Sequence, residues 1–302
     1  MSASERVTIR EVGPRDGLQP EAVQPVTVRA GLVDRLVAAG VTTVEAVAFV
    51  SPRAVPQMEG AGEVLAAVER VEGVRYLALV PNAKGAELAV AAGVDGLSLT
   101  VSASAVYSQR NVRMSVEESL GQVAAVRRVV GAALPLDTVI SCAFGSPYEG
   151  DIPVAEVAAI AGRATDAGST SLTFADTTGM GGPRGVEELL AVVGVDVGLH
   201  LHDTRGTALV NAYAGLQAGV RRFDTAVGGI GGSPFAKGAG GNLATEDLVN
   251  LCDSLGLATG IDLAQLLDVS RGLADTLGHP MPSRLTAAGP STAPTAPEKG
   301  RG

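Results

Sequence analysis

Tryptophan is absent from this sequence of 302 residues, and aromatic residues together make up only 3% of it. Proteins that bind single-stranded nucleic acid usually stack bases on aromatic side chains, so this composition argues against such a function. Positive charge is also scarce, because 23 Lys and Arg face 32 Asp and Glu, for a formal net charge of −9. That charge would repel a phosphate backbone. We therefore expect no nucleic-acid partner.

Cysteine is limited to Cys142 and Cys252. Two cysteines are too few for a disulfide framework or a cysteine-based zinc site, and single thiols are typical of a reducing cytoplasm. The N-terminal segment lacks the apolar core of a signal peptide and the Arg- and Ser-rich character of a transit peptide. No stretch is long enough to span a membrane. We therefore expect a cytoplasmic protein with no membrane partner.

Hydrophobic residues make up 46% of the chain and charged residues 18%, which is enough for a large core and excludes a mostly disordered chain. Short β-branched runs alternate with longer runs in which apolar residues recur every three or four positions. The predicted strands cover residues 7–12, 43–49, 76–80, 96–101, 138–143, 171–175, 197–201 and 223–227. The predicted helices cover residues 26–39, 60–71, 83–92, 115–133, 153–167, 183–193, 206–218 and 243–257.

This alternation predicts an α/β protein with a (β/α)8 TIM barrel. An open, doubly wound sheet is the alternative, because periodicity does not show closure. A further helix is expected over 262–277, and the end of the chain is rich in Pro, Ala, Gly and Thr without periodicity. We predict one barrel domain over 1–285 with an extra C-terminal helix, followed by a disordered tail over 286–302.

Two of the three histidines, His200 and His202, lie in the seventh predicted strand. Alternation along a strand places both imidazoles on one face, which at the C-terminal end of a barrel strand points to the active-site mouth. Two imidazoles make half of a metal site, whereas the alternative is two ordinary polar residues at a strand end. Asp203 would either orient a ring or cap the following helix.

Charged residues also occur where the first βα loop is expected, at Arg15 and Asp16 in GPRDGLQ. They would form either a solvated ion pair in a turn, or a ligand or base beside an arginine that stabilises an anion. Glu45 lies in an otherwise apolar strand, where a carboxylate is costly unless it is paired or near a metal. We favour a functional role for Glu45 over a structural ion pair.

A glycine-rich segment from Gly228 to Asn242 follows the last predicted strand. It matches neither a P-loop nor a dinucleotide fingerprint, so it would be a surface loop or a mobile lid with glycine hinges. Asn242 would cap a helix or give its carbonyl oxygen to a metal. Two oxygens and two imidazoles suit Mg²⁺ or Mn²⁺, and would also accept Zn²⁺ or Co²⁺. The residues that offer them are Asp16, His200, His202 and Asn242.

Several motifs resemble those of the hydroxymethylglutaryl-CoA lyases, which belong to a superfamily of metal-dependent TIM-barrel lyases, aldolases and synthases. They are EVGPRDGLQ at 11–19, FVSPRAVPQM at 49–58, PYEG at 147–150, HLHDT at 200–204 and GNLATEDLV at 241–249. The resemblance implies cleavage of 3-hydroxy-3-methylglutaryl-CoA (HMG-CoA), an acyl-CoA substrate, to acetyl-CoA and acetoacetate. A bound divalent metal would lower the pKa of the substrate hydroxyl. We also expect a homodimer.

The resemblance further implies roles for individual residues. Arg15 matches the arginine that stabilises the enolate oxygen of the leaving acetyl-CoA and contacts substrate, and Glu45 matches a carboxylate that takes part in proton transfer. Gln19 and Asp176 are expected in the substrate pocket, and Ser233 in the catalytic lid. The implied metal ligands are Asp16, which also counts as catalytic, His200, His202 and Asn242.

The positions that would face the substrate depart from the family pattern. The family lid segment GGCPYA is GGSPFA here, so that Ser233 replaces a cysteine that acts as an acid. Ala48 and Val139 stand where the family has residues with hydroxyl groups. These changes leave open a related lyase or aldolase that acts on a more apolar 3-hydroxyacyl thioester. The sequence is also compatible with a condensing enzyme of the same superfamily and with a relative that has lost turnover.

We expect Ser233 to limit the cleavage of HMG-CoA. A cysteine thiol has a pKa of about 8.5, whereas a serine hydroxyl is a far weaker acid. Loss of a positioned acid typically costs about 10²–10⁴-fold in rate, so Ser233→Cys should raise kcat at least about tenfold with saturating Mn²⁺. A folded, metal-loaded Ser233→Cys variant that is no faster would instead favour the more apolar substrate.

Overall fold

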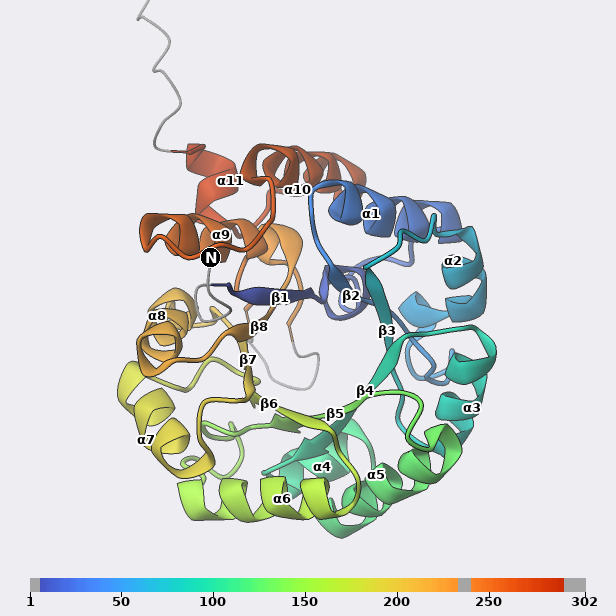
Figure 1. The fold of residues 1–302 in the computed structure, drawn as a ribbon, viewed down its shortest axis with the longest axis vertical. Helices are drawn as coiled ribbons and strands as arrows, with labels where there is room; N and C mark the ends of the chain where they lie inside the picture. The colour runs from blue at the N-terminus through green and yellow to red at the C-terminus, as the bar shows by residue number, and fades with distance from the viewer. Residues whose placement is uncertain (1–5, 233–239, 291–302) are drawn as a thin grey trace, which may run out of the picture.

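The computed structural model describes residues 6–232 and 240–290, and its centre is a closed barrel of eight parallel strands in the order β1 to β8 (Figure 1). Pairing of β1 with β8, in which Arg10 stands opposite Asp224, closes the ring and confirms the TIM barrel over the open sheet. The strands are β1 Thr8–Glu11, β2 Thr43–Ala48, β3 Arg75–Leu79, β4 Gly96–Ser102, β5 Leu136–Ser141, β6 Ser171–Asp176, β7 Gly198–Leu201 and β8 Arg222–Thr225.

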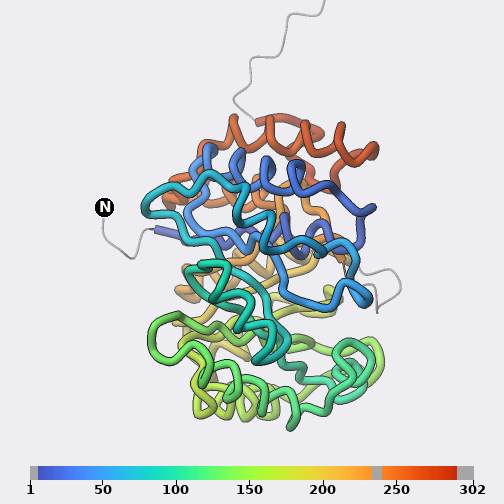
Figure 2. The backbone as a smooth tube through the Cα atoms, turned by 90° about the vertical axis from the view of Figure 1, so that its right-hand side faces the viewer, coloured from blue at the N-terminus to red at the C-terminus, as the bar shows by residue number. Residues whose placement is uncertain are grey.

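Helices surround the barrel and cover its outer face, and each predicted helix is present, with shifted ends for all but α7. They are α1 Val26–Ala38, α2 Ala61–Ala67, α3 Ala83–Ala91, α5 Val116–Val130, α6 Val154–Asp166, α7 Pro183–Val193, α8 Ala208–Ala218, α9 Thr245–Ser254 and α10 Leu263–Leu277. Helix α5 ends three residues earlier than predicted, before Gly131 at φ +57°. Helix α10 is the extra helix, and it lies beside α1 (Figures 1 and 2).

Short elements that the periodicity did not predict lie in the connections. They are the π-helical turn η2 Gly13–Gly17, the 3₁₀ turns η3 Pro56–Met58 and η4 Val227–Gly229, and the helices α4 Ala105–Asn111 and α11 Arg284–Ala288. Each spans three to seven residues. A segment of that length shows at most two helical turns, which is too few for an apolar repeat to be recognised.

Helix α11 corrects the predicted start of the disordered tail, because residue 286 lies inside it. Thr286 shares a hydrogen bond of 2.8 Å with Ser270 on α10 and donates to Glu246 at 2.6 Å. The Ser283 N–H donates to the Gly228 carbonyl at 3.0 Å, so this segment also contacts η4. Residues 291–302 of the predicted tail lie outside the described residues. Within the described part of the chain, no helix is both long and apolar enough to cross a membrane.

Glu11 links three segments beneath the mouth of the barrel. Its Oε1 accepts the N–H groups of Gly13 at 2.8 Å and Val227 at 2.9 Å, and its Oε2 accepts the Thr245 hydroxyl at 2.5 Å. The side chain is fully buried, and burial raises its pKa to about 7 despite these hydrogen bonds. Glu11 therefore joins η2, η4 and α9 through one carboxyl group.

A buried carboxyl with a raised pKa makes stability depend on pH. The folded chain holds the Glu11 proton up to about pH 7, whereas the unfolded chain loses it near its ordinary pKa, about 4.3. Glu11 thus stabilises the fold most at low pH, and this contribution is lost as the pH rises through 7. In Glu11→Gln, the fall in unfolding free energy between pH 5 and pH 8 should be smaller than in the natural protein.

Urea unfolding at both pH values measures this difference. Glu187→Gln, at an exposed glutamate on α7, is the control and should leave the pH dependence unchanged. An equal fall in the natural protein and in Glu11→Gln would show that Glu11 does not titrate in this range.

Candidate active site and metal centre

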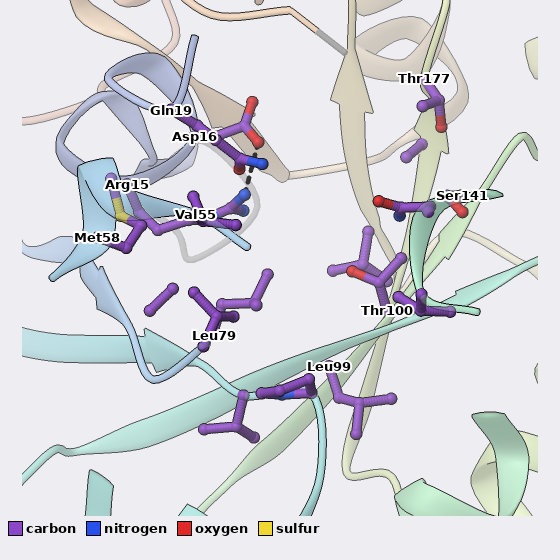
Figure 3. A pocket seen from close by; sticks show the side chains of 18 of the residues that line it. Arg15, Asp16, Gln19, Val55, Met58, Leu79, Leu99, Thr100, Ser141 and Thr177 are labelled. Carbon is purple, nitrogen blue, oxygen red and sulfur yellow. Dashed lines mark hydrogen bonds and ion pairs between the residues drawn. The ribbon is translucent and has the colours of Figure 1, made fainter. Parts of the chain in front are cut away.

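A cavity of about 490 Å³ opens at the C-terminal end of the barrel. Arg15, Asp16 and Gln19 line one side of it, and Ser141 and Thr177 lie opposite (Figure 3). Most of the wall between these polar ends is apolar. Its side chains include Ala48, Val50, Val55, Met58, Leu79, Leu99 and Val139. The cavity therefore has polar groups on two sides and an apolar wall between them, as is usual for a site that binds a small molecule.

The turn η2 places Arg15 and Asp16 at the cavity. Three successive N–H groups, those of Arg15, Asp16 and Gly17, donate to the Val12 carbonyl over 2.7–3.2 Å. This tight π-helical turn is of a kind often found at functional sites. It presents both charged side chains directly after strand β1.

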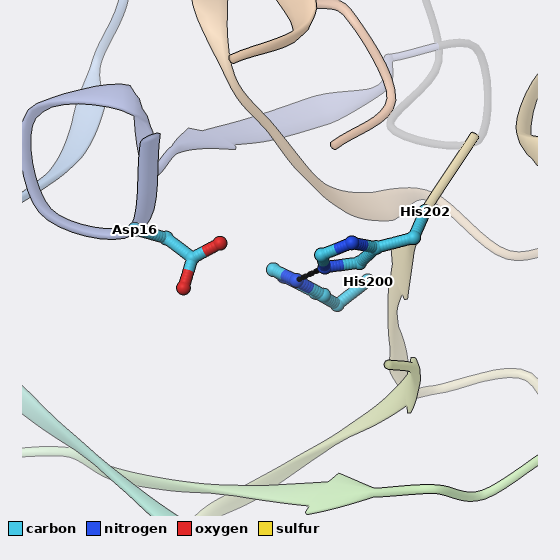
Figure 4. Close-up of side chains that lie close together, drawn as sticks. All are labelled: Asp16, His200 and His202. Atoms are coloured by element: carbon cyan, nitrogen blue, oxygen red, sulfur yellow. Dashed lines mark hydrogen bonds between the residues drawn. The ribbon is translucent and has the colours of Figure 1, made fainter. Parts of the chain in front are cut away.

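His200 lies in β7 and His202 directly follows that strand, and their Nε2 atoms are 3.1 Å apart (Figure 4). The two imidazoles therefore face the same side, as predicted. The Nδ1 of His200 contacts Asp224 Oδ2 at 3.2 Å, and that of His202 contacts the Gly240 carbonyl at 3.1 Å. Both partners only accept hydrogen bonds, so each Nδ1 carries the proton and each Nε2 a lone pair. With both Nδ1 atoms donating, the two Nε2 atoms face the same point, where one cation can contact both.

Asp16 and Asn242 complete the group. The Asn242 amide donates to Asp16 Oδ2 at 2.8 Å and to the Ile230 carbonyl at 3.0 Å. Its own Oδ1 is buried without a hydrogen-bond partner among the described residues, which is costly unless a cation or other donor faces it. Ligand atoms of Asp16, His200 and His202 all lie within 4.8 Å of one another. The structure thus brings together the four predicted ligands.

The electrostatics keep these ligands in metal-binding forms. Burial would raise the pKa of Asp16, but Arg15 and the two histidines lower it to about 2. Burial and the neighbouring His200 lower the pKa of His202 to about 4, so His202 is neutral near pH 7. The pKa of Asp224 lies well below its ordinary value, because Arg10 and His200 outweigh the effect of burial. A carboxylate, two imidazoles and an amide oxygen suit a divalent cation.

Glu45 lies behind Arg15 rather than in the cavity wall. Its Oε2 accepts hydrogen bonds from the Arg15 guanidinium and its Oε1 accepts one from Ser98, and only 1% of the residue is exposed. Arg15 also donates to Asp16 Oδ1 at 2.5 Å. Glu45 therefore fixes the orientation of Arg15, while its predicted part in proton transfer stays a prediction.

The remaining predicted site residues have different outcomes. Gln19 lines the cavity, but Asp176 is not among the described lining residues. The Asp176 carboxylate accepts the N–H groups of Met180 at 2.8 Å and Gly181 at 3.0 Å, and burial raises its pKa to about 6. It thus holds the loop after β6. Asp203 accepts the Ala208 N–H at 3.0 Å and so caps helix α8. Ser233 lies outside the described residues.

Two buried residues behind His200 were not predicted to belong to the site. Asp224 accepts from His200, and Arg10 in turn donates to Asp224. Both are charged residues inside predicted strands, which is the same signal that identified Glu45. The sequence alone does not show that β1 and β8 are neighbours, so the pair could not be recognised.

Comparisons with known proteins agree on one family. Residues 6–273 match the HMGL-like family. The mitochondrial hydroxymethylglutaryl-CoA lyase of Gallus gallus is 41% identical over 94% of this chain and 98% of that protein. The (R)-citramalyl-CoA lyase of Chloroflexus aurantiacus is 43% identical over 95% of this chain and 96% of that protein. An HMG-CoA lyase structure from Acinetobacter baumannii, in complex with coenzyme A and 3-methylmalate, superposes with a TM-score of 0.94. It is 38% identical, over 98% of this chain and 99% of that one.

We expect the purified protein to bind one Mn²⁺ or Mg²⁺ per chain. His200→Ala removes an imidazole ligand, so it should weaken Mn²⁺ binding by more than the ~10–100-fold that loss of an outer hydrogen-bond partner costs. His279→Ala is the matched control, because that histidine contacts Glu21 and the Pro280 carbonyl instead. Calorimetric titration of metal-stripped protein measures both. Equal affinities in the two variants would exclude His200 as a ligand.

Proposed function

The chain belongs to the HMGL-like family, and from that premise we propose that it cleaves HMG-CoA to acetyl-CoA and acetoacetate with a divalent metal, Mg²⁺ or Mn²⁺. Such an enzyme is a carbon–carbon lyase. The observation that carries the proposal is the unpartnered, buried Oδ1 of Asn242, because the amide of the same side chain contacts Asp16, whose ligand atoms lie within 4.8 Å of those of His200 and His202. These residues fit a cation at the polar end of a cavity with apolar walls.

Asp16, His200, His202 and Asn242 would hold the metal. When bound, the metal would lower the pKa of the substrate's C3 hydroxyl and hold its carboxylate. Once that hydroxyl loses its proton, the C2–C3 bond breaks, C3 becomes the ketone of acetoacetate and the electron pair moves into the acetyl-CoA enolate. Arg15 then donates to the enolate oxygen, because Glu45 and Asp16 hold its guanidinium at the cavity wall. A proton delivered to C2 completes acetyl-CoA.

A citramalyl-CoA-type substrate is the second candidate. The relative named (R)-citramalyl-CoA lyase, which is 43% identical to this chain, supports it. Arg15 is the only arginine or lysine among the described residues that line the cavity. HMG-CoA and citramalyl-CoA each carry one free carboxylate. With Arg15 assigned to the enolate oxygen, no other described arginine or lysine lines the cavity, so the metal would have to hold that carboxylate in either substrate.

A panel of acyl-CoA thioesters tests the proposal. Metal-stripped protein should cleave neither HMG-CoA nor citramalyl-CoA, and added Mn²⁺ should restore cleavage of the natural substrate. The ratio of kcat/KM values for the two thioesters decides between the candidates. Turnover by protein shown to be metal-free by elemental analysis would exclude the metal-dependent mechanism.

Compartment and assembly complete the proposal. The free cysteines Cys142 and Cys252 are both buried, which supports a reducing cytoplasm. We propose a homodimer, as expected from the resemblance, and light scattering of the purified protein tests it.

Arg15→Lys should lower kcat by about 10²–10³-fold, because an ammonium group cannot reproduce the planar fork of donors aimed at the enolate oxygen. The variant should melt close to the natural protein, since the positive charge beside Glu45 remains. Arg127→Lys serves as the control, because Arg127 donates only to backbone carbonyls far from the cavity, such as that of Gly168. If Arg15→Lys kept a kcat near that of the natural enzyme, Arg15 would not stabilise the enolate.

A further inference from the structure

Arg10 lies inside the barrel, where a guanidinium needs a specific reason to be stable. It comes from β1, is 9% exposed, and reaches two carboxylates on different strands. Its Nε donates to Asp224 Oδ1 at 2.7 Å and its Nη2 to Asp224 Oδ2 at 2.5 Å, which makes a two-point contact with β8. Its Nη1 donates to Asp137 Oδ2 on β5 at 2.8 Å. Since β1 and β5 face each other across the closed ring, Arg10 spans the barrel interior.

The Asp224 carboxylate receives Arg10 on one side and His200 on the other. The Nη2 of Arg10 and the Nδ1 of His200 both contact Asp224 Oδ2, at 2.5 Å and 3.2 Å. Because Arg10 holds both oxygens, the plane of the carboxylate cannot turn freely. That plane sets the direction in which His200 Nδ1 finds its acceptor, and therefore the direction in which Nε2 points on the other edge of the ring.

The other end of Arg10 is equally fixed. Asp137 accepts Ser171 at 2.6 Å and Thr173 at 2.8 Å besides Arg10, and Thr173 lies 3.4 Å from Arg10 Nη2. All of these groups are on strands rather than loops. The guanidinium is thus held by three strands, β5, β6 and β8, at the depth of the ring where β7 carries His200.

We propose that Arg10 is a positioning residue of the metal centre, which clamps the Asp224 carboxylate so that His200 keeps its Nε2 lone pair aimed at the cation. This inference rests on the metal site of the proposed function and adds a residue to it. Arg10 touches neither the cavity, among its described lining residues, nor the four ligands, so it acts through Asp224 alone.

Metal affinity is the property that this role predicts will change. Loss of an outer partner of a histidine ligand typically weakens metal binding 10–100-fold, so Arg10→Met and Asp224→Asn should each weaken Mn²⁺ binding by about that factor. Because Arg10 acts through Asp224, the double variant should bind within about threefold of Asp224→Asn alone. Arg10→Lys keeps the charge but loses the fork, so its affinity should fall between those of Arg10→Met and the natural protein.

The experiment measures free Mn²⁺ by electron paramagnetic resonance during titration of each metal-stripped variant. Circular dichroism and melting curves report folding, and Arg127→Met is the control for loss of a partly buried arginine that donates to backbone carbonyls. A second readout uses the thioester assay. In Arg10→Lys, the Mn²⁺ concentration for half-maximal rate should rise, while kcat at saturating Mn²⁺ recovers to within about threefold.

Several outcomes would overturn the proposal. One is a folded Arg10→Lys or Arg10→Met variant that binds Mn²⁺ as tightly as the natural protein, and another is a double variant whose losses multiply. Should Arg10→Met fail to fold, Arg10→Lys and Asp224→Asn still decide the question, because each replaces the side chain with a polar one of similar size. Natural protein that bound no Mn²⁺ would remove the metal site itself, whereas normal binding with unaffected Arg10 variants would remove only the role of Arg10.

Discussion

The interior of this barrel is built around charges that are taken out of water. Each buried charge costs several kcal/mol unless it is paired and hydrogen-bonded, and here almost all of the compensation comes from other charges on the strands and on η2. Two guanidinium groups face four carboxylates in this cluster. They are Arg10 and Arg15, and Asp16, Glu45, Asp137 and Asp224. With neutral histidines, two negative charges remain in excess, which is the charge that one divalent cation would neutralise.

The strands and the connecting loops contribute different parts of the candidate site. Strands carry His200, Asp224 and Glu45, and His202 directly follows β7, so these side chains belong to the rigid ring or its edge. The connections supply Asp16, Arg15 and Asn242, which contact one another at the barrel mouth. A change of the loops could therefore alter the carbon chain that the cavity accepts, while the two histidines keep their geometry.

Much of the fold could be predicted from the sequence because each βα unit has local sequence signals for its strand and for its helix. Glycines end several helices, as at Gly219 with φ +110°, and β-branched runs mark the strands. The histidine pair could also be predicted, because side chains two positions apart along a strand point to the same face. Contacts between side chains that depend on closure of the barrel could not be predicted in this way. Arg10 contacts residues 214 and 127 positions away, and no local pattern links them.

The same distinction explains the two site residues whose surroundings differ from expectation. Glu45 was identified as a carboxylate inside an apolar strand and Asp176 through the family resemblance, and both side chains are buried. Whether such a side chain faces the cavity or the loop behind it depends on which donors lie within reach. For Glu45 these are Arg15 and Ser98, and for Asp176 they are the N–H groups of its own loop. Donor positions of this kind follow from three-dimensional packing.

Gly228 connects the end of the chain mechanically to the barrel mouth. Its carbonyl accepts Ser283, its N–H donates to Glu246, and a Cβ there would stand 2.5 Å from Met281 Sδ. Helix α11 is in turn fastened to Glu246 through Thr286. Force applied to the C-terminus, whether by a fused domain or by an anchoring surface, would therefore pass through α11 into η4. Helix α11 is thereby connected to η4, the segment that precedes the proposed metal ligand Asn242 in the chain.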